Sequence, residues 1–228
     1  GWFLGALAYA DDVTLLAPPA AMRRMLAVCE NFAAKYQVVF NDNKSKCAFA
    51  SRRLSYCSSF KYASFCIGGN NIEFVTQWPH LGHVINSRLT DDDDISNRRG
   101  SLIGQANSLL CSFACLDPIS KIRLFQSYCC SHYGCELWDL SCAKLDDYCS
   151  SWRKALRRLW DLPYDFRSDY LAVISGCTPI YNEICRCGIN LIADCFNSES
   201  NMINFLMNRG VFYARSSSVF GKTVAPCS

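Results

Sequence analysis

Residues 3–16 constrain the fold of this chain more than any other stretch, because two adjacent carboxylates separate two short apolar runs. Leu7 lies in the first run and Val13 in the second, with Asp11 and Asp12 between them. Apolar runs around a polar centre predict a buried β-hairpin with both aspartates at its tip. Two adjacent like charges repel, and a divalent cation with oxygen ligands would relieve that repulsion. The simpler alternative is a plain hairpin that uses the two aspartates for their turn propensity.

Length and composition allow a packed core. The chain has 228 residues, which suits one large domain or two small ones. Half of the residues are hydrophobic and 19% are charged. A net charge of +3 permits a nucleic-acid partner without arguing for one. The uninterrupted apolar runs are too short to span a membrane, so no membrane partner is expected.

The 16 cysteines are unusually many. The chain has no signal peptide at its start, so a secreted disulfide framework is not favoured. Most cysteines, such as Cys29, Cys66 and Cys111, lie in apolar periodic stretches, which indicates reduced cysteine used as a small buried hydrophobe. The run from Cys129 to His132 is expected inside a helix, and its spacing matches no common zinc module. No structural zinc is therefore expected.

Periodicity predicts a mixed order of strands and helices. The run Gly68-Gly69-Asn70-Asn71 indicates a second hairpin over residues 64–75. Four aspartates at 91–94 could form a metal site, but a helix start is favoured, because aspartate suits the first turn. The expected strands and turns are 37–40, 41–43 and 47–50, and the expected helices are 20–36, one that begins at 90–94, 119–138, 145–160, 168–175 and 181–207.

The first hairpin also carries a family likeness. Tyr9-Ala10-Asp11-Asp12 between apolar strands resembles the motif that marks the palm of reverse transcriptases, and the following Val-Thr-Leu-Leu-Ala is similar to the non-LTR retrotransposon branch, of the jockey or chicken-repeat type. The turn Asn41-x-x-Lys44-Ser is similar to the next block of these enzymes. Leu81-Gly82 and the residues after it look like their primer-grip hairpin, and residues 124–138 look like their helical thumb.

The resemblance implies an α+β fold, a partial polymerase palm followed by a mainly α-helical thumb and a C-terminal helical region. The expected domains are 1–88 for half of the palm with the primer-grip hairpin, 89–140 for the thumb and 141–228 for a helical extension. It further implies that fingers, the first half of the palm and an endonuclease would precede Gly1, so the chain is expected to be a fragment. An intracellular location, nuclear or cytoplasmic, is expected.

The family's activity is copying RNA into DNA, which implies an RNA template, a DNA primer and deoxynucleotides as partners and Mg²⁺ or Mn²⁺ as the cofactor. Asp11 would be the main metal ligand, Asp12 would assist, and Lys44 would protonate the leaving pyrophosphate. His80, Leu81 and Gly82 would form the primer grip. The residues expected to contact nucleic acid are Tyr9, Arg98, Arg99, Lys121, Arg123, Arg153 and Arg157.

Several alternatives stay open. Lys44 can be a solvated surface lysine, and His80 and His83 can be edge-strand histidines without a ligand role. The basic side of helix 145–160 suits a nucleic acid, a membrane surface or plain solvent. A different class of function is a non-catalytic retrotransposon remnant that at most binds nucleic acid.

Overall fold

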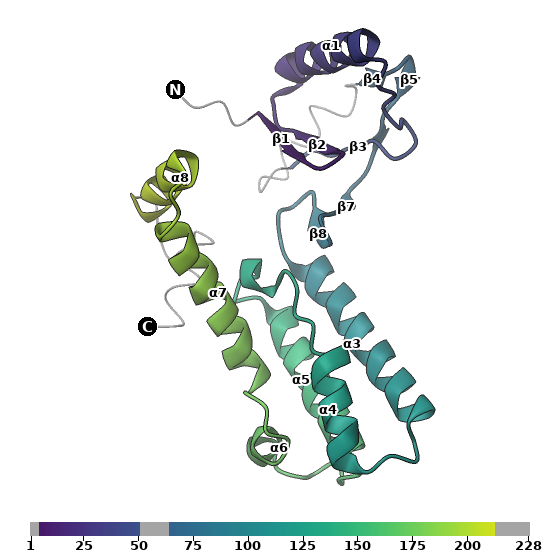
Figure 1. Cartoon of the computed structure of the whole chain (residues 1–228), viewed down its shortest axis with the longest axis vertical. Coiled ribbons are helices and arrows are strands. Elements are labelled where there is room, and N and C mark those ends of the chain that lie inside the picture. Colours follow the sequence, from purple (N-terminus) through teal and green to yellow (C-terminus); the bar gives the residue numbers. More distant parts are fainter. Residues whose placement is uncertain (1–4, 51–63, 213–228) are drawn as a thin grey trace. The chain divides into compact units, whose positions relative to one another are not determined.

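The computed structural model describes residues 5–50 and 64–212, without the side chains of 209–212. It separates into two compact units. The N-terminal unit comprises Gly1–Trp78 with Asn86–Leu89, and the helical unit comprises Pro79–Ile85 with Thr90–Ser228. Strands dominate the order of elements before residue 89 and helices dominate after it, so the chain is α+β (Figure 1). The expected division at 140/141 falls inside one continuous core, whereas that at 88/89 lies beside the boundary between the units.

The first hairpin forms as predicted. β1 (Ala6–Tyr9) pairs antiparallel with β2 (Asp12–Leu15), and Tyr9 opposite Asp12 is the last pair before the turn. Its predicted burial is wrong, because Leu7 and Val13 are about half exposed, at 46% and 50%. The physical reason is that this sheet has only two strands in the described part of the chain, so its apolar side chains are incompletely covered.

Helix α1 (Pro19–Tyr36) confirms the helix predicted from the apolar spacing. Proline suits its first turn, and Gln37 ends it in the left-handed conformation, with its N–H bonded to the carbonyl of Ala33. Leu26 is its buried residue and packs in a small cluster with Phe65 and Ile67. The strand predicted at 37–40 is absent, since Gln37 lies in a turn and residues 38–40 have no strand pairing.

The short strands pair differently from the predicted hairpin at 64–75. β4 (Cys66–Ile67) pairs with β5 (Asn70–Asn71) around Gly68 and Gly69, whose φ angles of 59° and 83° suit a two-residue turn. β6 (Glu73–Phe74) pairs instead in parallel with β3 (Lys46–Cys47), a partner distant in sequence. Lys46 and Glu73, opposite each other in this pair, form an ion pair of 2.6 Å.

A third hairpin precedes the helices. β7 (Gln77–His80) and β8 (His83–Asn86) form a two-stranded sheet joined by Leu81 and Gly82. Both turn residues have positive φ, 46° and 79°, as a tight two-residue connection requires.

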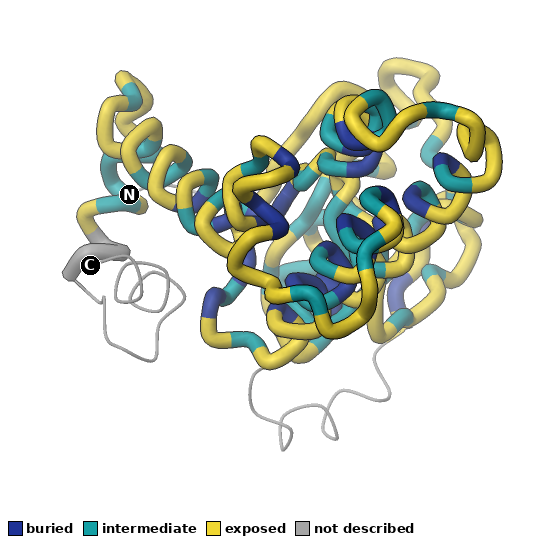
Figure 2. Tube along the Cα trace, turned by 90° about the horizontal axis from the view of Figure 1, so that it is seen from below, coloured by how far each residue is buried: buried dark blue, intermediate teal, exposed yellow. Residues whose placement is uncertain are grey.

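The helical unit is built around α3 (Asp92–Ser112), α4 (Pro118–Tyr128) and α5 (Ala143–Leu159), which lie side by side (Figure 1). Their buried residues recur at helical spacing along each helix (Figure 2). Phe125 and Leu156 are fully buried in this core. The predicted helices that start at 90–94 and cover 145–160 are therefore confirmed.

Two predicted helices are each interrupted. The helix expected over 119–138 ends at Tyr128, so Cys129–His132 lies beyond the helix and not inside it. A 3₁₀ turn, η2 (Cys135–Leu137), follows Gly134, whose φ is 86°.

The last helices follow in chain order. Helix α6 (Ser168–Ile174) forms as predicted. Two helices, α7 (Ile180–Phe196) and α8 (Asn201–Phe212), replace the single helix predicted over 181–207. The polar run at 197–200 explains the break, because the Ser198 hydroxyl accepts the N–H of Ser200.

The described cysteines are free thiols. Cys129, Cys135 and Cys149 are buried, whereas Cys66 and Cys111 are exposed, which corrects the expectation for those two. Over the residues that the structure describes, no helix has both the length and the apolar character needed to cross a membrane.

Candidate functional site

The tip of the first hairpin presents two carboxylates to solvent. Ala10, in the turn, has a φ of 51°, a left-handed conformation that alanine rarely adopts. Strained backbone of this kind concentrates at functional sites. Tyr9, Asp11 and Asp12 are all exposed, Tyr9 at 67%. Neither carboxylate makes a hydrogen bond or an ion pair with any described residue.

Two free carboxylates on adjacent residues suit a hard cation such as Mg²⁺. They supply only part of a ligand set, because such ions take six or more oxygen ligands. Within residues 5–50 and 64–212, no group of three or more histidine, cysteine or acidic side chains could hold a metal ion. The remaining ligands would have to come from substrate, water or other protein segments.

Lys44 lies in a polar turn of the N-terminal unit. Its backbone N–H donates to Oδ1 of Asn41 at 3.1 Å, and the Ser45 hydroxyl donates to the carbonyl of Asn41 at 2.8 Å. This accounts for the predicted turn at 41–43. The Lys44 side chain is exposed, and among the described residues it has no bond to Asp11 or Asp12.

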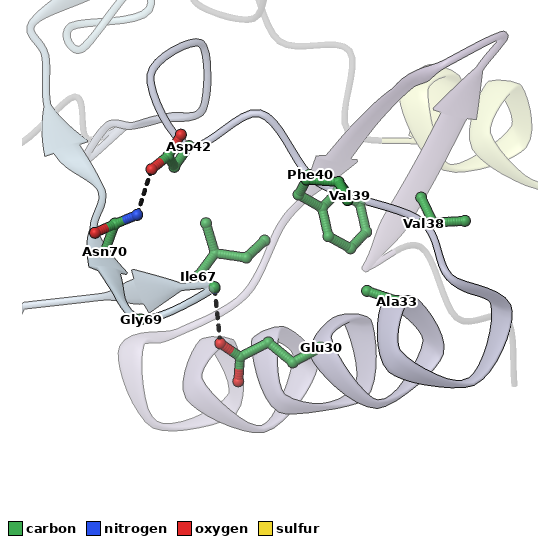
Figure 3. Close-up of a pocket in the computed structure, with 10 residues that line it drawn as sticks. Glu30, Ala33, Val38, Val39, Phe40, Asp42, Ile67, Gly69 and Asn70 are labelled. Atoms are coloured by element: carbon green, nitrogen blue, oxygen red, sulfur yellow. Dashed lines mark hydrogen bonds between the residues drawn. The ribbon is translucent and has the colours of Figure 1, made fainter.

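A cavity of about 410 Å³ lies between α1 and the β4–β5 hairpin (Figure 3). Apolar side chains such as Val38 and Ile67 form part of its wall. Both of its carboxylates are already engaged, since Glu30 accepts the N–H of Gly68 at 3.0 Å and Asp42 accepts from the amide of Asn70. Each of these carboxylates therefore already accepts a hydrogen bond from a neutral group of the chain, and a ligand would have to share or displace it.

The third hairpin contains the residues expected to grip a primer. His80 is half-buried, and Leu81 and Gly82 are exposed. Side chains of the helical unit hold the backbone of this turn. Arg98 donates to the carbonyl of Gly82, and the Tyr133 hydroxyl donates to the carbonyl of Leu81 at 2.9 Å.

Most basic residues expected on a nucleic-acid surface have partners within the chain. Arg99 Nε donates to the Ser151 hydroxyl at 2.8 Å, and Arg153 donates to the Ser150 hydroxyl at 2.9 Å. Arg157 donates twice to one carbonyl, that of Phe166. With Arg98 these residues help to fix the helical unit. By contrast, Lys121 is half-buried and Arg123 exposed, and neither side chain is bonded to a described residue.

Sequence reasoning missed a buried acidic centre at the start of α3. Asp94 is fully buried, and its carboxylate accepts the N–H of Val84 at 2.8 Å and the indole N–H of Trp138 at 2.7 Å. His83 Nδ1 lies 3.2 Å from the same carboxylate. The helical spacing could have predicted the burial of Asp94, because Asp94 lies about two turns before Leu102, a buried residue on the same face of the helix.

The neighbouring aspartates of this run make separate contacts. Asp91 accepts the N–H of Asp139 at 2.7 Å, and its pKa is raised by burial, an effect which that hydrogen bond partly offsets. Asp92 accepts from the Cys142 thiol at 3.2 Å and from the Thr90 hydroxyl at 3.1 Å. The predicted helix start is confirmed, although Asp91 at the N-cap makes no capping bond.

Burial also shifts the pKa values of ionisable groups elsewhere in the helical core. The pKa of His132 is lowered by burial, and its Nδ1 lies 2.9 Å from the Tyr148 hydroxyl. Burial raises the pKa of the Cys130 thiol to about 12 and that of the Cys129 thiol to about 11. Thiols with pKa values this high are largely protonated at neutral pH, so they are poor nucleophiles.

No protein-family model, no curated protein and no solved structure matches this chain.

Proposed function

We propose that this chain is part of an RNA-directed DNA polymerase of the non-LTR retrotransposon type. The observation that carries the proposal is the tip of the first hairpin, where Tyr9-Ala10-Asp11-Asp12 closes an antiparallel pair of apolar strands. Its carboxylates are exposed, adjacent and without partners among the described residues. An unpaired acidic pair on strained backbone suits a bound divalent cation.

The order of elements also supports the proposal. After the acidic hairpin come a helix, a lysine-bearing turn, a short hairpin with a Leu81-Gly82 turn, and then a helical unit. The resemblance implies this order for half of a palm, a primer grip and a thumb.

The chain's own residues would have defined tasks. When bound at this tip, Mg²⁺ would supply charge stabilisation for the attacking primer hydroxyl and the leaving pyrophosphate. Asp11 would bind metal, and Asp12 would assist or keep the hairpin geometry. Lys44 would donate a proton to the leaving pyrophosphate, which requires its turn to approach the hairpin when substrate is bound. The Leu81-Gly82 turn would hold the primer end, and Lys121 and Arg123 would contact phosphates.

A non-catalytic remnant that at most binds nucleic acid is the second candidate. One observation favours it, namely that the described residues contain no complete metal-ligand group. Additional ligands supplied by protein sequence upstream of Gly1 would remove this objection. Sequencing the gene upstream of the first codon therefore separates the two candidates, because a polymerase needs an open frame with another aspartate-bearing strand.

Primer extension tests the proposal directly. The longest open frame that contains this chain should extend a DNA primer on an RNA template with Mg²⁺, and Asp11→Asn should reduce the rate by several powers of ten. Asp146→Asn is the matched control, because Asp146 is also exposed and also followed by an aspartate, but on helix α5. Extension by Asp11→Asn at the rate of the control would refute the assignment.

A further inference from the structure

The turn between β7 and β8 is held by its backbone. Three side chains of the helical unit bind consecutive peptide groups: Tyr133 binds the Leu81 carbonyl, Arg98 binds the Gly82 carbonyl, and Asp94 binds the N–H of Val84. Arg98 also lies over the Tyr133 ring, 5.7 Å from its centroid. These bonds leave the side chains of Leu81 and Tyr133 exposed, at 39% and 57%.

Gly82 shows how closely the turn packs against the rest of the helical unit. Its φ of 79° is unfavourable for a residue with a side chain, and an added Cβ would lie 3.0 Å from Tyr133 Cε1. The adjacent contact is nearly as close, since a Cβ at Gly134 would lie 3.2 Å from His83 Nδ1. Both glycines allow backbone and ring to meet where larger residues would separate them.

Asp94 connects this turn to the core. Its two oxygens accept from Val84 and Trp138, and the His83 ring lies beside them, so one carboxylate joins β8, α3 and the segment before α5. A carboxylate buried without partners would be very costly, and here the two hydrogen bonds from Val84 and Trp138 compensate. An aspartate that served only to start the helix would be exposed to solvent and would not need these partners.

We propose that Asp94 is a positioning residue of the polymerase, and that it sets the turn at residues 81–84 in the orientation that meets the primer strand. This inference rests on the proposed function. Asp94 touches no substrate; it acts through Val84 and Trp138, while Leu81, Gly82 and the exposed edge of Tyr133 form the contact surface. Asp94 therefore does more than contribute to a helix start.

Hydrogen exchange on the present chain tests the positioning without any need for activity. Asp94→Asn keeps the shape of the side chain but replaces one acceptor oxygen by a donor, so amides at 81–84 should exchange at least about tenfold faster. Tyr133→Phe removes a single hydroxyl from an exposed residue and should have a smaller effect of the same kind. Tyr164→Phe is its control, because Tyr164 is 82% exposed and bonded to no described residue.

Kinetics of the extended polymerase tests the consequence. Both Asp94→Asn and Tyr133→Phe should raise KM for the primer–template, by about tenfold for the first, while KM for the deoxynucleotide stays unchanged. Partial unfolding would lower the amount of active enzyme and leave both KM values alone. If Asp94→Asn does not fold, Tyr133→Phe carries the test.

The outcomes separate the two proposals. Unchanged exchange at 81–84 in both variants would overturn the positioning role. Faster exchange with an unchanged primer–template KM would overturn the link to the primer. If the wild-type protein extends no primer, the proposed function fails, and exchange alone then decides whether Asp94 holds the turn.

Discussion

Replacing Leu26 by alanine is expected to unfold the N-terminal unit and leave the helical unit folded. The core of the N-terminal unit, within the described residues, has three buried apolar side chains, Leu26, Phe65 and Ile67. Such side chains contribute about 1.5–3 kcal/mol each, so this core supplies on the order of 5–9 kcal/mol before the entropic cost of ordering the chain. Little net stability remains for this unit.

The expected loss in the free energy of unfolding follows from the burial of Leu26. Leucine-to-alanine changes in buried sites cost about 2.7–5 kcal/mol, and the lower end applies here because the side chain is 8% exposed and its neighbours can relax. A loss of about 3 kcal/mol corresponds to roughly a hundredfold increase in the exchange rate of amides that open with the unit. This loss is a large fraction of the gross burial energy.

Hydrogen exchange with mass spectrometry resolves the two units in one sample. Leu26→Ala should remove protection from α1 and β4 and leave α3 and α5 at wild-type rates. Leu16→Ala is the matched control, because Leu16 lies in the same unit but is 56% exposed. Leu156→Ala should give the reverse pattern, since Leu156 is fully buried in the helical core. Simultaneous loss of protection in α1 and α5 in either variant would refute the division into two units.

Three further predictions concern the helical unit and the turn. Burial lowers the pKa of His132 from its ordinary value of 6.5, so the folded state favours the neutral ring. The stability that this provides is present above pH 6.5 and is lost as the pH falls below it. The urea midpoint of the wild-type protein should therefore drop between about pH 7 and 5, and that of His132→Gln should drop less. Gly82→Ala should destabilise by about 1–2 kcal/mol through its left-handed backbone, whereas Gly104→Ala, in an open position on α3, should stabilise by up to ~1 kcal/mol in thermal melts. Arg123→Ala should flatten the salt dependence of duplex binding by about one unit, and Arg99→Ala should change it less, because its guanidinium already has an internal partner.

The sequence by itself determined the local elements. The apolar spacing predicted α1, α3 and α5 within a few residues, because a helix is stabilised by contacts three and four residues apart. The hairpins around Asp11 and around Gly68-Gly69 were also predictable, since two-residue turns impose their own backbone requirements. The acidic pair was visible as a candidate site because its two carboxylates are adjacent in the sequence.

Only the tertiary structure decided which partners these elements take. The parallel pairing of β3 with β6 joins strands with no local signal for each other. Leu7 is exposed although its pattern predicted burial, because burial depends on whether another layer covers the strand. Arg98 and Asp94 show the same principle in charged residues. Their spacing predicted that they lie on a helix, but their hydrogen bonds to the turn at 81–84 and to Trp138 depend on the tertiary structure. Packing between segments distant in sequence is a property of the whole chain, so a local pattern cannot encode it.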